Sequence, residues 1–424
     1  MADKVISMRT ALNSPFSPGS DSVPEVWAGR TEQLSDWRDV VRPRRIAGLP
    51  ERGRTILGEA GLGKSTLVRR IARDAAATGD WVTQQLRIPS GADPLKIVAT
   101  AILKLADQAG LSTSREKSIT DALSRVETVA ASGISLSLRQ QTGPEPYTVL
   151  TALLVEVGRA AIARGDRMVL IHIDEVQNIT NEHALSQLLI ALGDALVHEE
   201  EITAPGGVRV LRSLPLAVYL TGLPDFADMA GARTGATFAR RFKTTLLTAI
   251  ADDDLVSALQ PFIIDGWPVF DEASTADDLG GITRIHMEPA AVTTIVELCC
   301  GEPFLFQLAG EQAWYAGSGD LVTRAQVLTG WKAARAEAAT HVERILDRLP
   351  KRERDFVQAM SERPAHERTL TRIAHDMGLT KATDAGPTSQ RLDSVRGIIE
   401  RGKPYTFRHR AVEAYLASDW PDID

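Results

Sequence analysis

One segment constrains the fold of this 424-residue sequence more than any other: Gly58-Glu59-Ala60-Gly61-Leu62-Gly63-Lys64-Ser65. It follows a short apolar run at 55–57 and opens a stretch, 64–77, in which apolar residues recur with helical spacing. A glycine-rich turn between a strand and a helix lets backbone N–H groups surround an anion, and the helix N-terminus adds partial positive charge. The pattern G-x-x-x-x-G-K-S in this context therefore predicts a phosphate loop that binds a nucleotide.

The side chains of this loop have separate expected roles. Lys64 is expected to reach the β and γ phosphates, and the Ser65 hydroxyl to ligate Mg²⁺. The remaining loop residues are expected to contact the phosphates mainly through their backbone; they are Gly58, Glu59, Ala60, Gly61, Leu62, Gly63 and Thr66. The predicted ligands are thus ATP or ADP together with Mg²⁺.

Two carboxylates follow the apolar run 168–173. Ligands of open α/β sheets bind at the carboxyl ends of the strands, where Asp174 and Glu175 would lie. Asp174 is expected to hold Mg²⁺ through water, and Glu175 to orient and deprotonate an attacking water. His172, inside the same run, is interpreted as a packed residue rather than a catalytic one.

A further apolar run, 216–221, ends in Thr221, whose hydroxyl is a candidate partner for the attacking water or the γ-phosphate. Apolar runs of strand length alternate with helical patterns from residue 55 to residue 221, and a single strand is expected over 81–88. This alternation predicts an α/β fold with a parallel sheet and helices on both faces.

The chain is divided into four predicted regions. Residues 1–22, rich in Ser, Pro and Gly, are expected to form a flexible arm, and 23–250 the nucleotide-binding core with an insertion at about 111–146. An alternating stretch in that insertion, 132–138, is interpreted as a structural hairpin. Residues 251–341 read as an all-helical lid, and 342–424, with three helices and a short strand, as a winged helix-turn-helix domain.

Composition limits the class of protein further. No apolar run approaches the roughly 20 residues that cross a bilayer, so no membrane partner is expected. The two cysteines, Cys299 and Cys300, are adjacent, which fits neither a zinc site nor a disulfide framework and favours a reducing cytoplasm. The last 78 residues carry 14 Lys and Arg against 13 Asp and Glu, whereas residues 1–346 carry 34 against 42. Contact with DNA is therefore expected only from the C-terminal region.

Several further motifs resemble those of AAA-type ATPases related to origin-recognition initiators and to the signal-transduction (STAND) ATPases. Residues 27–34 (WAGRTEQL) resemble the box that precedes the core of these proteins, and 221–224 (TGLP) follows the acidic strand in the family's order. Residues 238–242 (FARRF) resemble its A-E-R stretch, and 301–307 (GEPFLFQ) its lid helices. The resemblance covers nearly the whole chain from about residue 22.

This resemblance implies roles for individual residues. Arg30 would lie near the adenine and sugar, and Thr221 would sense the γ-phosphate. Arg241, or its neighbour Arg240, would reach the γ-phosphate of an adjacent subunit as an arginine finger. Pro303 stands in a G-x-P sequence where initiators carry a lid arginine, as in the STAND variant whose proline packs against adenine. The expected protein is therefore a slow ATP hydrolase that acts as a nucleotide-dependent switch and assembles into a homo-oligomer when nucleotide is bound.

Three roles remain open. The first is an initiator-like or transposition-helper-like regulator that binds double-stranded DNA through a recognition helix over 388–401, with Arg391, Arg396 and Arg408 as the candidate contacts. The second is a STAND-type scaffold without DNA, which switches a protein effector in signalling or phage defence. The third is a metabolic P-loop kinase, disfavoured because the sequence shows no acceptor site.

Overall fold

The computed structural model describes residues 8–19, 22–110, 145–165, 167–203, 207–226, 229–230, 240–270 and 282–423. The chain forms two compact units. The sheet unit contains Thr31–Gly58 and Lys64–Leu246, and the helical unit contains Met1–Arg30, Glu59–Gly63 and Leu247–Asp424. Apart from residues 145 and 146, the predicted insertion, with its alternating stretch 132–138, lies outside the described residues.

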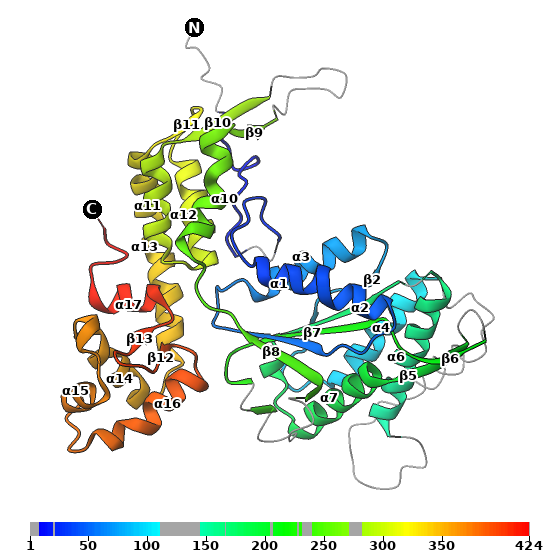
Figure 1. Ribbon diagram of the computed structural model, residues 1–424. Helices are drawn as coiled ribbons and strands as arrows, with labels where there is room; N and C mark the ends of the chain where they lie inside the picture. The colour runs from blue at the N-terminus through cyan, green and yellow to red at the C-terminus, as the bar shows by residue number, and fades with distance from the viewer. Residues whose placement is uncertain are drawn as a thin grey trace. The chain divides into compact units, whose positions relative to one another are not determined.

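A parallel sheet forms the centre of the sheet unit, with strand order β2-β4-β7-β1-β8 and β3 also paired to β4 (Figure 1). The strands of this sheet are β1 (Gly53–Leu57), β2 (Trp81–Val82), β3 (Leu86–Arg87), β4 (Val169–Asp174), β7 (Leu216–Gly222) and β8 (Phe242–Leu246). Every residue of β1, β4 and β7 is buried, as the apolar runs predicted. The prediction of a parallel α/β sheet is confirmed.

Helices cover both faces of this sheet because side chains along a strand alternate between its faces. One face presents Val169, Ile171 and Val218 to a core shared with α4 (Pro94–Gln108), α6 (Pro146–Ala163) and α7 (Glu182–Val197). On the other face, the Trp37 ring of the π-helix η1 (Asp36–Val41) packs against Tyr219, with ring centroids 6.1 Å apart. Further helical elements of the unit are α1 (Thr31–Ser35), α2 (Arg42–Ile46), α3 (Lys64–Ala77) and η2 (Val176–Asn178).

Helix α6 is, within the described residues, the one helix long and apolar enough to cross a membrane. Half of it is buried inside the structure, where it packs against α4 and α7. A core helix of a globular domain passes the same test of length and composition, so this helix is weak evidence for a membrane span.

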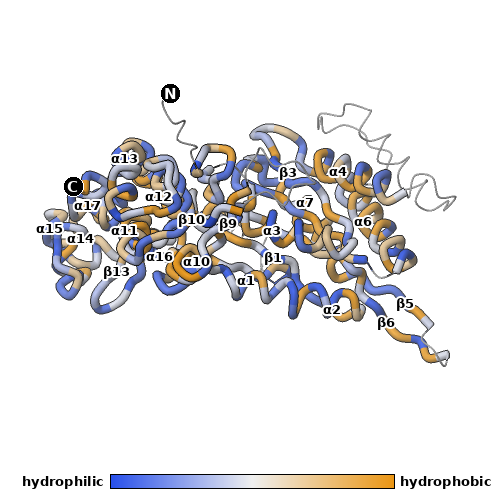
Figure 2. The backbone as a smooth tube through the Cα atoms, turned by 90° about the horizontal axis from the view of Figure 1, so that it is seen from above, coloured by the Kyte–Doolittle hydropathy of each residue, from blue (hydrophilic) through white to orange (hydrophobic). Residues whose placement is uncertain are grey.

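Three features of the sheet unit differ from the sequence-based expectation. The single strand expected over 81–88 is two short strands, β2 and β3, which both pair with β4. Strand β8 at the sheet edge and the hairpin of β5 (Glu199–Thr203) with β6 (Arg209–Ser213) were not predicted. Both consist largely of exposed residues and so carry no apolar run; Figure 2 shows the hairpin projecting from the sheet.

The region predicted as an all-helical lid contains a small sheet as well as helices. Its helices are α10 (Asp252–Ile264), α11 (Pro289–Cys299), α12 (Pro303–Tyr315) and α13 (Arg324–Asp347). Its sheet has the order β11-β10-β9, from β9 (Trp267–Val269), β10 (Thr283–Met287) and β11 (Leu321–Val322). Strands this short leave little periodicity to detect.

Helix α13 also runs through the boundary expected at 341–342, and one hydrophobic core spans both sides of that boundary.

Residues 8–19 pack against the helical unit, unlike the flexible arm expected over 1–22. The Arg9 guanidinium donates to the carbonyl oxygens of Gly319, Ala313 and Leu321 at 2.8, 3.3 and 3.2 Å. The Phe16 ring is buried and stacks on Phe262 with centroids 5.9 Å apart. An arginine and an aromatic ring thus contribute to anchoring a segment whose overall composition is typical of a loop.

The C-terminal region has the predicted winged-helix elements. Its helical elements are α14 (Lys351–Ser361), η3 (Ala365–Glu367), α15 (Leu370–Asp376), η4 (Ala382–Ala385), α16 (Gly386–Ser394) and α17 (Arg410–Ala417). The wing is the antiparallel pair β12 (Ile399–Glu400) and β13 (Thr406–Phe407). The helix expected over 388–401 ends earlier, at Ser394. Gly397 follows with φ +67°, a left-handed conformation that favours glycine and ends the helical path.

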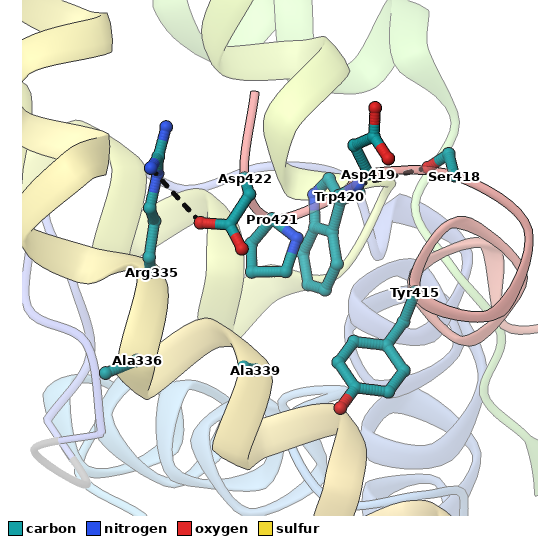
Figure 3. Close-up of a pocket in the computed structure, with 9 residues that line it drawn as sticks. All are labelled: Arg335, Ala336, Ala339, Tyr415, Ser418, Asp419, Trp420, Pro421 and Asp422. Atoms are coloured by element: carbon teal, nitrogen blue, oxygen red, sulfur yellow. Dashed lines mark hydrogen bonds and ion pairs between the residues drawn. The ribbon is translucent and has the colours of Figure 1, made fainter. Parts of the chain in front are cut away.

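Trp420 anchors the C-terminal tail to the helical unit. Its indole N–H donates to the Leu298 carbonyl oxygen at 3.0 Å, and Trp331 donates to the carbonyl oxygen of the next tail residue, Pro421, at the same distance. Figure 3 shows the open pocket of about 520 Å³ beside this tail, with Asp422 directed at Arg335, 3.1 Å away.

A buried carboxylate joins three parts of the helical unit. Glu302, at the start of α12, is fully buried; its Oε2 lies 2.6 Å from Nε2 of His341 in α13, and its Oε1 lies 3.5 Å from Nδ1 of His409, just before α17. Burial alone would raise the pKa of Glu302, but the hydrogen bonds and charges of the two histidines outweigh it and lower this pKa to about 2. This carboxylate therefore ties the wing side of the unit to α12 and α13.

Replacing Gly330 with alanine should destabilise the protein. A Cβ at this position of α13 would lie 2.2 Å from the Gln312 carbonyl oxygen of α12, so the two helices would have to separate. We expect a loss of about 2 kcal/mol, since overpacking outweighs the roughly 1 kcal/mol that alanine gains over glycine in a helix. Gly386→Ala is the matched control, because nothing lies within 4 Å of its Cβ position. Equal melting temperatures for the two variants would contradict this packing.

Candidate nucleotide site

The phosphate loop begins at the buried end of a central strand. Strand β1 ends at Leu57, and the Gly58 N–H donates to the Gly222 carbonyl oxygen at the end of β7, at 3.2 Å. Helix α3 begins at Lys64, the residue predicted to open it. The strand, the loop and the helix therefore follow one another as the motif requires.

The loop segment Glu59–Gly63 has the backbone of an anion-binding turn. Gly61 and Gly63 have φ angles of +83° and +77°, in the left-handed region that glycine adopts without strain. Within the described residues, no hydrogen bond uses the N–H groups of residues 60–63. Successive backbone N–H groups left free in such a turn form a concave site for phosphate oxygens.

Residues of the helical unit, to which Glu59–Gly63 belongs, contact this segment. The Phe304 N–H donates to the Gly61 carbonyl oxygen at 3.2 Å, and a Cβ on Gly63 would lie 3.6 Å from that of Pro303. Arg30 Nη2 donates to the carbonyl oxygens of Leu62 and Thr248 at 3.0 and 2.9 Å. Burial lowers the pKa of Arg30 to about 10, with Asp254 acting in the opposite direction. The structure thus brings Arg30 and Pro303 to the loop itself; contact with adenine stays a prediction for both.

Lys64 and Ser65 converge on the carboxylate of Asp174 in the sheet unit. The Ser65 hydroxyl donates to Oδ1 of Asp174 at 3.0 Å. Lys64 is half-buried, and its partial desolvation lowers its pKa to about 8, although the nearby Asp174 and Glu175 act in the opposite direction. Since these residues come from the start of α3 and the end of β4, the geometry unites the two strongest motifs of the sequence.

Asp174 accepts further hydrogen bonds that sequence reasoning did not foresee. The Thr221 hydroxyl donates to Oδ1, the Gln85 amide donates to Oδ2, and Arg87 Nε lies 3.4 Å from Oδ2. Burial raises the pKa of Asp174, but these bonds, with the His172 and Ser65 interactions, outweigh it and lower the pKa. Arg87 in β3 stands directly opposite Asp174 in the ladder, so a correct register for 81–88 would have indicated this contact.

The side chains present at this point fit a magnesium ion. A serine hydroxyl and an ionised carboxylate oxygen, 3.0 Å apart, are the hard oxygen ligands that Mg²⁺ prefers. Ser65 and Asp174 are the residues that would hold it. Elsewhere in the described chain, His, Cys, Asp and Glu residues form no group of three or more that suits a metal.

Glu175 leaves the strand in a strained conformation. Its φ and ψ are +54° and +44°, a left-handed conformation that costs a non-glycine residue on the order of 1 kcal/mol. The side chain is exposed, and its Oε2 accepts from Asn178 Nδ2 at 2.9 Å. Strain of this kind clusters at functional sites, and here it turns a carboxylate outward at the carboxyl end of β4.

Thr221 and His172 form a buried pair beside Asp174. The Thr221 hydroxyl lies 3.1 Å from Nε2 of His172 and donates to Asp174. Burial lowers the pKa of His172 to about 4, which keeps the imidazole neutral near pH 7. The geometry agrees with the interpretation of His172 as packed, and it commits the Thr221 hydroxyl to Asp174.

The two candidate finger arginines lie at the opposite edge of the sheet from the loop. They immediately precede β8, whose first residue pairs with Gly53 at the start of β1, whereas the loop follows the end of β1. Four residues of strand separate these edges by about 13 Å. Arg241 forms an ion pair with Asp194 of α7, and Arg240 is exposed. Residues 238 and 239 of this motif lie outside the described residues.

The three arginines expected to contact DNA are held in ion pairs. Arg391 Nε and Arg396 Nε each lie 3.0 Å from the buried carboxylate of Glu353 in α14. Arg408 lies 2.7 Å from Asp393 in α16. These pairs give the three arginines a structural role within the C-terminal region.

Comparison with known proteins gives matches to solved structures alone. No protein-family model matches the sequence, and no curated protein does. The ORC2 protein of Aeropyrum pernix, solved as ADPNP–ADP complexes, is 16% identical with a TM-score of 0.50; the match covers 98% of this chain and 96% of that one. The Walker-type ATPase PABY2304 of Pyrococcus abyssi is 15% identical with a TM-score of 0.52, covering 92% and 96%. At these identities the likeness shows the fold, and the chain has the fold of an ORC-like AAA+ ATPase.

Proposed function

We propose that this protein is an ATP-binding switch of the AAA+ type that hydrolyses ATP slowly. The observation that carries the proposal is the convergence of Ser65 and Asp174, whose side-chain oxygens lie 3.0 Å apart, near the half-buried Lys64. A phosphate loop followed by a helix, with a carboxylate at the end of the neighbouring strand, is the arrangement that holds a magnesium nucleotide. The A. pernix protein of similar fold was itself solved with ADPNP and ADP.

Each residue would act on the nucleotide in a distinct way. The free N–H groups of the loop and the Lys64 ammonium bind phosphate oxygens, while Ser65 and Asp174 hold Mg²⁺, which neutralises phosphate charge when bound. Glu175, outward-facing at the strand end, orients the attacking water and accepts its proton at a carboxylate oxygen. Thr221 donates to Asp174 and so keeps that carboxylate turned toward Ser65.

Slow turnover and switching are supported by the lid. Pro303 packs near Gly63 at the position where initiators of this type carry an arginine. Without that cation, less of the charge that develops on the phosphates is neutralised during hydrolysis. A long-lived ATP state that differs from the ADP state suits a molecular switch.

Lys64→Ala and Glu175→Gln should separate binding from hydrolysis. Loss of the lysine ammonium should weaken binding of ATP at least a hundredfold, since it removes a charge-assisted contact to two phosphates. Glu175→Gln should bind ATP as the unaltered protein does and hydrolyse it at least a hundredfold more slowly, because the base is lost. Calorimetry and a phosphate-release assay measure the two effects, with Lys96→Ala, an exposed lysine in α4, as the control. Normal ATP binding by Lys64→Ala would refute the site.

Arg240 is the better candidate for a finger that acts on a neighbouring subunit. It is exposed, whereas Arg241 is tied to Asp194, and the edge it occupies lies too far from its own loop for action within one subunit. A homo-oligomer would bring this edge to the loop of an adjacent copy. We therefore propose a nucleotide-dependent oligomer with Arg240 at the subunit boundary.

Mixing variants tests this arrangement. Arg240→Ala should hydrolyse ATP roughly 10³-fold more slowly, the effect of losing an arginine finger. Mixed with Glu175→Gln, it should regain hydrolysis, because one variant supplies the arginine and the other the intact site. Arg241→Ala serves as the comparison and should lower the melting temperature. A mixture no more active than its components would exclude action between subunits.

Contact with double-stranded DNA is proposed for the wing rather than for the predicted recognition helix. Arg401 and Lys403 are exposed between β12 and β13, and neither forms an ion pair in the described part of the chain. Free cations on a projecting wing suit phosphates of the DNA backbone. A protein effector in place of DNA is the alternative.

The salt dependence of binding tests the wing. Changing Arg401 and Lys403 together to alanine should weaken binding of duplex DNA and reduce the slope of log affinity against log salt by about 2, one for each phosphate contact. The control is Lys351→Ala, an exposed lysine of α14 paired with Asp355. Fluorescence anisotropy at several salt concentrations measures both quantities. If the unaltered protein binds no DNA at low salt, the effector role replaces this one.

A further inference from the structure

The phosphate loop contains a buried acid. Glu59, the second residue of the loop, has only 3% of its surface exposed, and its carboxylate forms an ion pair with the guanidinium of Arg348. Both residues belong to the helical unit. No role in the proposed chemistry has been given to either side chain so far.

A carboxylate at this position opposes the function of the loop. The loop would bind a polyanion through N–H groups and a lysine, all within six residues of Glu59 in the sequence. A buried negative charge is screened by solvent less than an exposed one, so it would repel a phosphate bound nearby more strongly than an exposed acid would. A cation beside Glu59 reduces this repulsion.

Arg348 supplies that cation from a different part of the chain. It caps the C-terminus of α13 and is followed within three residues by α14, the first helix of the winged-helix region. In the described residues, Glu59 is the acid with which it pairs. Burial lowers the pKa of Arg348, and so does the positive charge of Arg396, which pairs with Glu353 of α14.

The same unit fixes the loop segment around Glu59. The Gly61 carbonyl oxygen accepts from the Phe304 N–H, and a Cβ on Gly61 would lie 2.3 Å from the ring of His341 in α13. The ion pair therefore does not hold an otherwise loose loop in place. What the arginine adds to these contacts is charge.

We propose that Arg348 is a positioning residue that makes the phosphate loop competent for nucleotide by neutralising Glu59. This role rests on the ATP-binding function proposed above, and it adds a way in which nucleotide binding is regulated. Nucleotide affinity then depends on where the α13–α14 junction holds Arg348. By linkage, a partner that displaces this junction weakens nucleotide binding, and bound nucleotide resists that displacement by the same free energy.

The two partners of this ion pair should have opposite effects on affinity. Arg348→Gln removes the positive charge beside the Glu59 carboxylate and should weaken binding of Mg-ADP on the order of tenfold. Glu59→Gln removes the repulsion and leaves a free cation, so it should bind at least as tightly as the unaltered protein. The double variant should bind within about threefold of Glu59→Gln. If the ion pair mattered only for packing, replacing either Arg348 or Glu59 would weaken the binding of Mg-ADP.

Calorimetry with Mg-ADP on the full chain provides the test, at low and at high salt. Arg354→Gln is the matched control, because Arg354 forms an exposed ion pair with Asp347 at the same junction. Rescue of Arg348→Gln by Glu59→Gln, with a deficit that shrinks at high salt, would establish the proposal. A double variant as weak as Arg348→Gln, or weakened binding by Glu59→Gln alone, would overturn it.

Absence of ADP binding by the unaltered protein and misfolding of Arg348→Gln would each be recognised separately. If the unaltered protein binds no ADP, the proposed function fails and not the role of Arg348 alone. If Arg348→Gln does not fold, the affinity of Glu59→Gln decides by its sign: tighter or equal binding supports the proposal, and weaker binding refutes it.

Discussion

The arrangement of the sheet unit depends on the hydrogen bonds that the buried carboxylate of Asp174 accepts. A buried negative charge is costly unless donors surround it, and here Ser65, Thr221 and Gln85 all donate to it. These donors stand at the start of α3, at the end of β7 and just before β3, so satisfying one carboxylate fixes the carboxyl edge of three strands and the beginning of a helix. The same donors point its oxygens toward the place where a magnesium nucleotide would be bound.

The helical unit repeats this principle with buried acids of its own. Glu302 is matched by His341 and His409, Glu353 by Arg391 and Arg396, and Glu59 by Arg348; these are pairs between elements distant in sequence. Removing one partner of a buried pair leaves an uncompensated charge, which costs far more than the pair contributes. These buried ion pairs therefore specify how α12, α13 and the winged-helix elements pack together. They also hold arginine side chains in contacts within the protein.

Much of the sheet unit could be predicted because its strands are buried on both faces. Strands β4 and β7 and helix α3 were predicted to within about a residue, since a fully buried strand reads as an apolar run and an amphipathic helix keeps its period. Strand β8, the β5–β6 hairpin and the strands β9, β10 and β11 were missed because they are exposed or very short. The end of α16 was misplaced because one left-handed glycine, Gly397, ends it within an otherwise helical pattern.

The sequence by itself determined the chemistry of the candidate site: a glycine-rich loop, a lysine, a serine and two acids in an order that a phosphate-binding α/β fold requires. Local backbone needs dictate these residue types, so they are visible without a structure. Only the tertiary structure decided which charged side chains form ion pairs with one another within the protein. Arg391, Arg396 and Arg408 remain predicted DNA contacts, and the structure adds the acids with which they pair. It likewise adds the ion pair of Glu59 with Arg348. These ion pairs join residues that are between 15 and 289 positions apart, and no local pattern encodes that pairing.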